Sequence, residues 1–335
     1  MLKKETWSIL SNNVVISQNK VDPSAVTLDT RRKIRKRKID DVLSNWQMYL
    51  LLLPSIIFVF VFSYIPMYGV LIAFQDFDPY LGFLKSPWVG FKHFTDFFQS
   101  VVFWKLIRNT LVISITNLVA GFPTPIILAL LINELRSRLF KKVVQTVSYL
   151  PYFVSTVVVV GMVVQFTTPS TGIINQIIKV FGGEPINFMA ESAWFVPLYT
   201  LSGLWQYIGW SSIIYIAALS GIDPTLYEAA IMDGASRLKQ MIHISIPSIM
   251  PTIIIMFIFA IGGLLSVSYE KIILMYRPIT YDTADVINTY IYRTGVLGGM
   301  YSASTAIGLF QTVINSLLLV GSNYISKKTT ETSLW

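Results

Sequence analysis

Six long apolar runs constrain the fold of this chain more than any other feature of its sequence. About 20 consecutive apolar residues cross the hydrocarbon core of a bilayer, and each run reaches that length. Apart from Arg108, near the start of the second run, the runs contain no Asp, Glu, Lys, Arg or His. The sequence therefore predicts an all-α membrane protein, a bundle of six transmembrane helices. The runs cover residues 49–74, 106–132, 146–166, 194–219, 248–268 and 302–324.

The distribution of charge predicts the orientation of these spans. Only 13% of the residues are charged, whereas a soluble domain carries about 25%. The net charge is +8, and seven of the eight residues 31–38 are basic. Further Lys and Arg residues lie in 133–145, 221–247 and 327–335. Because Lys and Arg in short loops favour the cytoplasmic side, both termini and residues 221–247 are predicted to be cytoplasmic.

The basic block before the first span has a second interpretation, an arm that binds nucleic acid. Such a block next to a span is far more often an orientation signal, and it can also contact anionic lipid headgroups. We therefore expect the lipid bilayer as its partner, and no nucleic acid. The start of the chain lacks an apolar core of signal-peptide length, so no cleaved signal is expected. The expected organisation is a basic N-terminal segment (1–45), a six-span domain (46–326) and a tail (327–335).

Residues that catalysis or metal binding would need are scarce. The chain has no Cys and two His, and its one adjacent acid–base pair, His93 and Asp96, lies in a loop. General acid–base chemistry thus has no site, and an ion-coupled carrier would need a buried titratable group. No GxxxxGK[ST] loop is present to bind nucleotide phosphates. The sequence predicts a non-enzyme with no catalytic residue, metal or cofactor of its own; a non-transport membrane enzyme or scaffold remains the alternative.

The stretch 221–247 is amphipathic, unlike the runs on either side of it. Asp223 is a good helix N-cap, and Pro224 fits the first helical position, where its missing N–H costs nothing. Gly234 can end this helix, because glycine tolerates the left-handed backbone of a helix end. A second short helix follows, and Pro247 opens the next apolar run. The pattern predicts two short helices joined at a glycine on the membrane face, although an ordinary interfacial connector would look similar.

The spacing within this stretch resembles a known motif. Glu228-Ala229-Ala230, three residues, Gly234, nine residues and then Ile244-Ser245-Ile246-Pro247 match the EAA motif of binding-protein-dependent ABC importer permeases, except that Ile246 replaces the usual Leu. The resemblance implies a type I ABC importer permease whose coupling helix docks on a cytoplasmic ATPase dimer, which binds the ATP. Glu228 would orient the loop, and Gly234 would permit its turn. The implied coupling residues are Glu228, Ala229, Ala230, Asp233, Gly234, Ile244 and Pro247.

Looser matches extend the resemblance over nearly the whole chain. Residues 88–94, 103–111, 285–293 and 302–308 resemble segments of oligosaccharide (maltose-type) permeases, in particular the branch that imports polysaccharide fragments such as alginate or rhamnogalacturonan oligomers. The resemblance implies a multi-pass protein of the bacterial cytoplasmic membrane. It also implies a second permease subunit in a heterodimer, an ABC ATPase dimer, an extracytoplasmic solute-binding protein and an oligosaccharide substrate.

Polar and aromatic residues in the fourth and fifth runs are candidates for the substrate pathway. Aromatic planes with amide and hydroxyl groups suit a neutral polyol, although small and hydroxyl residues also serve helix packing in membranes. An anionic cargo, such as glycerol phosphate, would instead predict buried Arg or Lys, and the spans offer none at depth. By analogy with the family, the expected pathway residues are Gln206, Tyr207, Trp210, Gly263 and Ser266.

Overall fold

The computed structural model describes residues 45–330 and 332–335, so the predicted N-terminal segment lies outside the described residues except for Asn45. The chain divides into two compact units at Tyr68 and Gly69. The described part of the first unit is one helical segment, which continues into the second as η3 (Tyr68–Phe74). Together these elements form a candidate span from Trp46 to Phe74. The first unit's elements are α2 (Trp46–Val59), η2 (Phe60–Tyr64) and α3 (Ile65–Met67).

The second predicted run is a continuous helical path despite its glycine and prolines. α6 (Phe103–Gly121) leads directly into α7 (Pro123–Asn133), and together they form a 31-residue candidate span. Pro123 begins α7, so its missing N–H removes no bond that the new helix needs. The hydroxyl of Thr124 donates to the Ala120 carbonyl at 2.8 Å, which pairs a backbone group at the junction.

The third predicted run is broken, which corrects the expectation of a single straight span. α8 (Arg138–Tyr149) and the 3₁₀ turn η4 (Leu150–Phe153) meet α9 (Thr156–Thr167) at a bend of 97°. The break has a local cause, because Pro151 lies in the turn and Ser155 caps the next helix by accepting the amide of Val158. The proline and the N-cap residue that follows it therefore interrupt the helix, although the run is continuously apolar.

The fourth run forms α11 (Ser192–Ser220), a 29-residue helix packed along α6, α7 and α8. Its Tyr, Trp, Ser and Gln side chains keep it outside the set of helices that are long and apolar enough to span by composition. Among the described residues that set holds four helices, or five if the bent α8–α9 pair crosses as one, against six predicted. The two beyond those already given are Arg237–Gly262 and Tyr301–Thr330.

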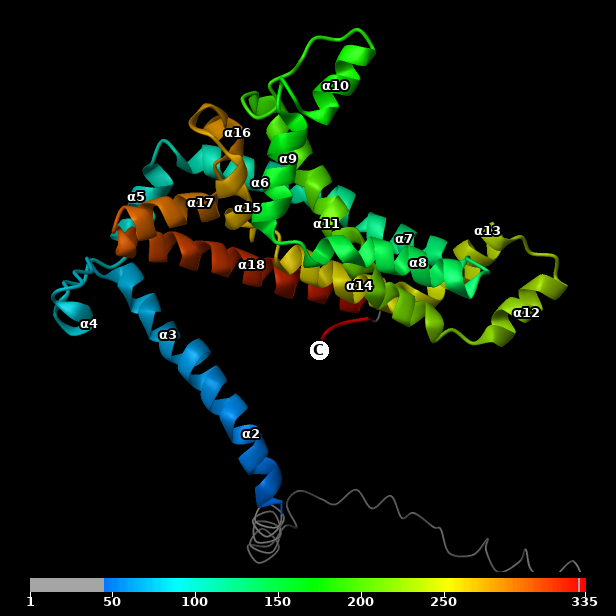
Figure 1. Ribbon diagram of the computed structural model, residues 1–335. Helices are drawn as coiled ribbons and strands as arrows, with labels where there is room; N and C mark the ends of the chain where they lie inside the picture. Colours follow the sequence, from blue (N-terminus) through cyan, green and yellow to red (C-terminus); the bar gives the residue numbers. More distant parts are fainter. Residues whose placement is uncertain (1–44, 331) are drawn as a thin grey trace, which may run out of the picture. The chain divides into compact units, whose positions relative to one another are not determined.

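The remaining elements of the second unit lie around α11. α14 (Ile246–Gly262) packs along α18 (Tyr301–Thr330), which extends beyond the predicted sixth run. Figure 1 shows α12 and α13 at one end of this unit and α5, α10 and α16 towards the other. The other elements are α4 (Gly82–Lys85), α5 (Lys92–Gln99), α10 (Ile173–Val180), α12 (Pro224–Met232), α13 (Arg237–Gln240), η5 (Met241–Ser245), α15 (Tyr269–Met275), η6 (Pro278–Thr280), α16 (Tyr281–Ala284), α17 (Ile287–Ile291) and η7 (Tyr292–Leu297).

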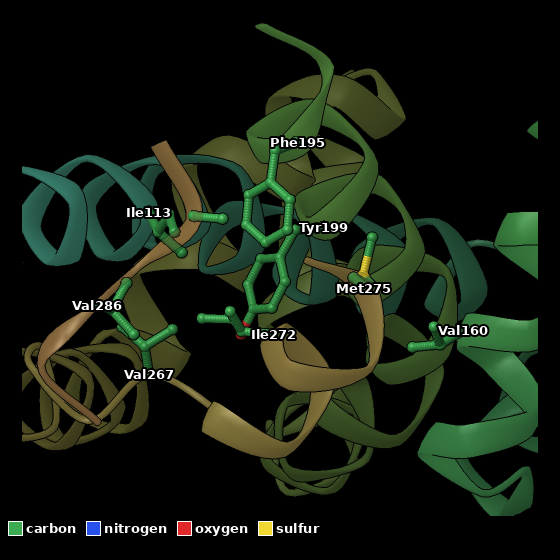
Figure 2. Packing of buried hydrophobic residues seen from close by; sticks show 9 residues of the cluster. Ile113, Val160, Phe195, Tyr199, Val267, Ile272, Met275 and Val286 are labelled. Carbon is green, nitrogen blue, oxygen red and sulfur yellow. The ribbon is translucent and has the colours of Figure 1, made fainter. Parts of the chain in front are cut away.

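A buried apolar cluster joins α6, α9 and α11 to α15 and α16 (Figure 2). The rings of Phe195 and Tyr199 stack with centroids 6.2 Å apart inside it. Ile272 and Met275 bring α15 into the same cluster. This packing holds α15, which follows α14 in the chain, against the middle of the bundle. The position of α15 matters for the cavities described below.

Candidate functional site

The helix α12 has well-defined ends on both sides, as the sequence predicts. The Asp223 carboxylate accepts the amide of Thr225 at 2.9 Å, and this hydrogen bond holds the pKa of Asp223 below its usual value. At the other end Gly234 adopts φ +74°. The amides of Gly234 and Ala235 donate to the carbonyls of Ile231 and Ala230, which is the Schellman pattern. Both ends of α12 are thus fixed by the residues predicted to fix them.

The second short helix of this stretch is not separate, which corrects the predicted two-helix loop. α13 begins at Arg237 behind the N-cap Ser236 and continues through η5 into α14 without a break. Proline inside a helix removes one backbone hydrogen bond and clashes with the preceding turn. The π-helical turn η5 ends at Ser245, two residues before Pro247, and accommodates this change. The loop therefore consists of α12, a glycine turn and the first turns of a long helix.

The surface of this loop is exposed and partly apolar. Glu228, Ala229, Asp233, Gly234 and Pro247 are exposed, and Ala230 and Ile244 are half-buried. Large apolar side chains also lie open on it, with Met232 86% and Ile231 62% exposed. Exposed apolar patches of this kind on a defined element mark interaction sites.

One contact holds the loop together, and another attaches it to the rest of the bundle. The hydroxyls of Tyr227 and Ser245 lie 2.9 Å apart, which ties α12 to η5. Arg237 reaches the end of α7, where its Nη1 lies 3.6 Å from the Glu134 carboxylate and 3.3 Å from the Glu134 carbonyl. These contacts link α12 to η5, and α13 to the end of α7.

A cavity of about 490 Å³ lies between α6, α11, α14 and the segment 263–268 that follows α14. Its size is that of a small-molecule site. Ser114 of α6 lines it, and the Ser114 hydroxyl is buried without a hydrogen-bond partner. Its other polar lining residues are Asn117, Tyr199, Ser211, Tyr215, Ser266 and Ser268.

A second cavity of about 190 Å³ adjoins the first, because the two share lining residues on α6 and α11. Thr200 lines it, with a buried hydroxyl that has no hydrogen-bond partner. Lys271 of α15 also lines it and is 4% exposed. Burial lowers the pKa of Lys271 to about 8, so its ammonium remains mostly charged at neutral pH.

The five predicted pathway residues lie in two different places. Gly263 and Ser266 line the larger cavity, and Tyr207 lines the smaller one. Gln206 donates to the Val154 carbonyl at 2.9 Å. Trp210 stacks on Tyr152 of η4 with ring centroids 4.2 Å apart. These last two side chains thus lie on the face of α11 that packs against η4, and neither lines the described cavities.

The segment after α14 has irregular backbone that α18 pairs. α14 ends at Gly262, before the predicted fifth run does, so residues 263–268 leave the helix. Asn315 accepts the Leu265 amide at 3.1 Å and donates to the Ser266 hydroxyl, while Gln311 donates to the Leu265 carbonyl. Irregular backbone in a membrane bundle persists where other protein groups pair it or where it borders a cavity. Both conditions hold here.

Sequence reasoning missed several polar residues of the cavities, among them Ser114, Thr200 and Lys271. The lysine lies just beyond the fifth run and reads as a loop residue, and only the fold of α15 onto α11 buries it. Ser114 and Thr200 are isolated hydroxyls in apolar runs, a pattern that ordinary helix packing also produces. The described residues contain no group of three or more His, Asp or Glu placed to hold a metal ion.

Comparison with known proteins gives one family and several close relatives. The profile of the family described as "Binding-protein-dependent transport system inner membrane component" matches residues 121–331. Protein LplB of Bacillus subtilis is 46% identical over 84% of this chain and 88% of its own length. The polygalacturonan/rhamnogalacturonan transport system permease protein YteP of the same species is 43% identical, covering 93% of this chain and 98% of the relative.

Two solved structures have a similar fold. One is a crystal structure of a bacterial ABC transporter involved in the import of the acidic polysaccharide alginate. Its matching chain is 43% identical with a TM-score of 0.82, over 88% of this chain and 99% of that one. The other is a bacterial alginate ABC transporter in complex with an alginate pentasaccharide-bound periplasmic protein. Its chain is 42% identical with a TM-score of 0.81, over the same shares of both chains.

Proposed function

Because this chain belongs to the family of binding-protein-dependent transport system inner membrane components, we propose that it forms one half of the translocation pathway of an ATP-driven importer of oligosaccharides or polysaccharide fragments. It is a multi-pass inner-membrane transport permease and not an enzyme. The substrate class is supported by the relatives, one a polygalacturonan/rhamnogalacturonan permease and another from an alginate importer.

The exposed helix α12 is the observation that carries the coupling part of this proposal. Its ends are fixed, its small residue Ala229 is open to close approach, and Met232 and Ile231 present apolar surface. We infer that it docks on an ABC ATPase dimer through Glu228, Ala229, Ala230, Asp233 and Gly234. Ile244 and Pro247 connect the docked helix to α14. Closure of the ATPase would then move α14 through η5 and α7 through Arg237.

The pathway is proposed to run through the two cavities, with Tyr207, Gly263 and Ser266 among its lining. Buried hydroxyls without partners, at Ser114 and Thr200, are suited to bind sugar hydroxyls. Trp210, stacked with Tyr152 and 43% exposed, offers a flat aromatic surface that suits the C–H face of a sugar. Gln206 supports this surface by holding the Val154 carbonyl.

The assembly proposed for this chain follows the family and its relatives. The partners are a second permease subunit, which completes the pathway, the ATPase dimer, and an extracytoplasmic solute-binding protein. A structure of a related transporter contains a periplasmic protein bound to an alginate pentasaccharide. We further infer six spans, with α11 and the α8–α9 pair added to the apolar helices, and both termini on the cytoplasmic side of a bacterial cell membrane.

The substitution Ala229→Trp tests the docking of α12. A large indole at this exposed position should block close approach of the ATPase, so we expect at least a tenfold loss of copurifying ATPase and of ATP-driven uptake. The control Ala229→Ser keeps a small side chain and should behave as wild type. Copurification of the second permease subunit checks that the bundle has folded. Normal uptake by Ala229→Trp with a full complement of ATPase would contradict the proposal.

A further inference from the structure

Lys271 is a buried cation at the wall of the smaller cavity. Its ammonium donates to the Tyr199 carbonyl at 3.0 Å and lies 4.8 Å from the centre of the Tyr199 ring. Both contacts come from α11, on which α15 packs. A buried charge is costly unless it is paired and hydrogen-bonded. The single carbonyl and the ring face offset only part of that cost.

No carboxylate pairs with this ammonium among the described residues. Their ion pairs are Lys105–Asp282, Arg237–Glu134 and Arg293–Asp285. The described lining of the smaller cavity contains no Asp or Glu. An ammonium has three N–H donors, and the protein accepts one of them at Tyr199. The other two donors have no hydrogen-bond acceptor among the described residues.

The surroundings of the ammonium leave room for a ligand. A Cβ at Gly203, one turn of α11 beyond Tyr199, would lie 3.3 Å from the Lys271 Nζ. The absence of a side chain there keeps the approach to the nitrogen open. The unpartnered hydroxyl of Thr200 lines the same cavity, together with Tyr207, Ser211 and Ser268. One cation among several hydroxyl groups matches a sugar that carries both hydroxyls and a carboxylate.

We propose that Lys271 binds the carboxylate of a uronate-containing oligosaccharide during its passage, and that this makes the pathway selective for acidic over neutral sugars. The inference rests on the proposed function and adds a specificity-determining residue to it. It also replaces the neutral polyol that the residues of the spans alone suggest. A purely structural anchor is the competing account, in which Lys271 does no more than hold α15 to α11 through Tyr199.

The test uses the complete transporter, with its second permease, ATPase and binding protein, in proteoliposomes. Tetragalacturonate and a neutral galactose tetrasaccharide are the two probes. Lys271→Met removes the charge at similar length, and Lys271→Arg keeps it. We expect tetragalacturonate uptake to fall at least tenfold in Lys271→Met, which corresponds to about 1.4 kcal/mol. In Lys271→Arg it should stay within about threefold of the wild-type rate. Both variants should copurify with the second permease and the ATPase as the wild type does.

Several outcomes would overturn the proposal. Wild-type tetragalacturonate uptake by Lys271→Met would do so, as would an equal loss of uptake in Lys271→Arg, because a structural anchor predicts those results. If the wild-type transporter imports the neutral probe but not tetragalacturonate, Lys271 does not select acidic sugars. The proposed function would still stand in that case. ATP-driven uptake of neither probe would count against the proposed function itself.

A pH series provides the same test without Lys271→Met, should that variant fail to assemble. The elements packed against α15 bring only tyrosines, Tyr199, Tyr207 and Tyr215 on α11 and Tyr290 on α17, and α9 brings no titratable group. Besides Lys271, α15 itself carries Tyr269 and Glu270. Because the pKa of Lys271 is about 8, the wild type loses this charge between pH 7 and 9. Arginine keeps its charge, so Lys271→Arg should carry tetragalacturonate at least fivefold faster than wild type at pH 9. Parallel pH profiles would overturn the proposal.

Discussion

Single residues without side chains decide how closely the helices of this bundle approach. A Cβ on Gly209 of α11 would collide with the backbone carbonyl of Ser148 in α8. Small residues at such crossings let helix backbones meet in membrane bundles. Gly161 of α9 is the opposite case, because nothing lies within 4 Å of the position its Cβ would take. Two glycines in helical segments thus have different structural roles, and the difference lies in their neighbours.

We expect Gly209→Ala to destabilise the bundle and Gly161→Ala to leave it unchanged or slightly more stable. The first substitution forces α8 away from α11, and such overpacking costs about 1–3 kcal/mol. The second removes only the helix penalty of glycine, about 1 kcal/mol relative to alanine. Thermal unfolding of the two purified variants in the same detergent checks the prediction. Equal midpoints would show that the α8–α11 contact yields without cost.

At the scale of elements, a buried polar network fixes α16 and α17 against α6. Asn109 donates to the carbonyls of Asp282 and Asp285 at 2.9 and 3.0 Å. The Asp285 carboxylate receives both Nη groups of Arg293, at 3.1 and 2.7 Å, and the Thr289 hydroxyl. This pairing raises the pKa of Arg293 further above its usual value. The network holds short helices that have little apolar surface of their own.

Two aspartates in this region form a matched pair for measuring the network. Asp285 is 5% exposed, and Asp285→Asn leaves Arg293 without its charged partner, so we expect a loss of about 2 kcal/mol in stability. Asp282 pairs with Lys105 at 2.7 Å but is open to solvent, and surface pairs contribute little. Asp282→Asn should therefore unfold at nearly the wild-type temperature. Equal losses from the two substitutions would contradict a buried network.

At the scale of the molecule, the second unit separates the helix proposed to dock on the ATPase from the cavities proposed to pass the substrate. α12 lies at one end (Figure 1), while the two cavities lie between α6, α11, α14 and α15. The long helix from Arg237 to Gly262 joins these regions, because it begins beside α12 and ends at the irregular segment that lines the larger cavity. The proposed coupling therefore needs no further element between the two regions, because a single helix contacts both.

Uptake should depend on ATP and not on an ion gradient. The chain lacks a nucleotide-binding GxxxxGK[ST] loop, so the energy source is expected to be the separate ATPase. In proteoliposomes, we expect uptake to require ATP on the side of α12 and to persist when a protonophore or sodium removal abolishes ion gradients. An ATPase-inactive partner is the control and should stop uptake. Gradient-driven uptake with that inactive partner would contradict the mechanism.

The sequence by itself determined the class of the protein and the limits of α12. The near absence of charge in long apolar runs requires a membrane bundle, because a bilayer admits few other arrangements. The limits of α12 were predictable because caps are local: Asp223, Pro224 and Gly234 act on backbone groups within a few residues of themselves. The same locality explains the break at Pro151 and Ser155, a signal that the third run's apolarity obscured.

Only the tertiary structure determined which side chains line the cavities. Lys271 follows a span in the sequence and becomes buried because α15 folds back onto α11, which no local pattern specifies. Gln206 and Trp210 share a helix with Tyr207, and all three contact η4 or the residue after it, yet only Tyr207 also lines a cavity. Helical periodicity gives the relative directions of side chains, but which direction meets a cavity depends on neighbours distant in sequence. Burial and charge pairing are for that reason properties of the folded bundle.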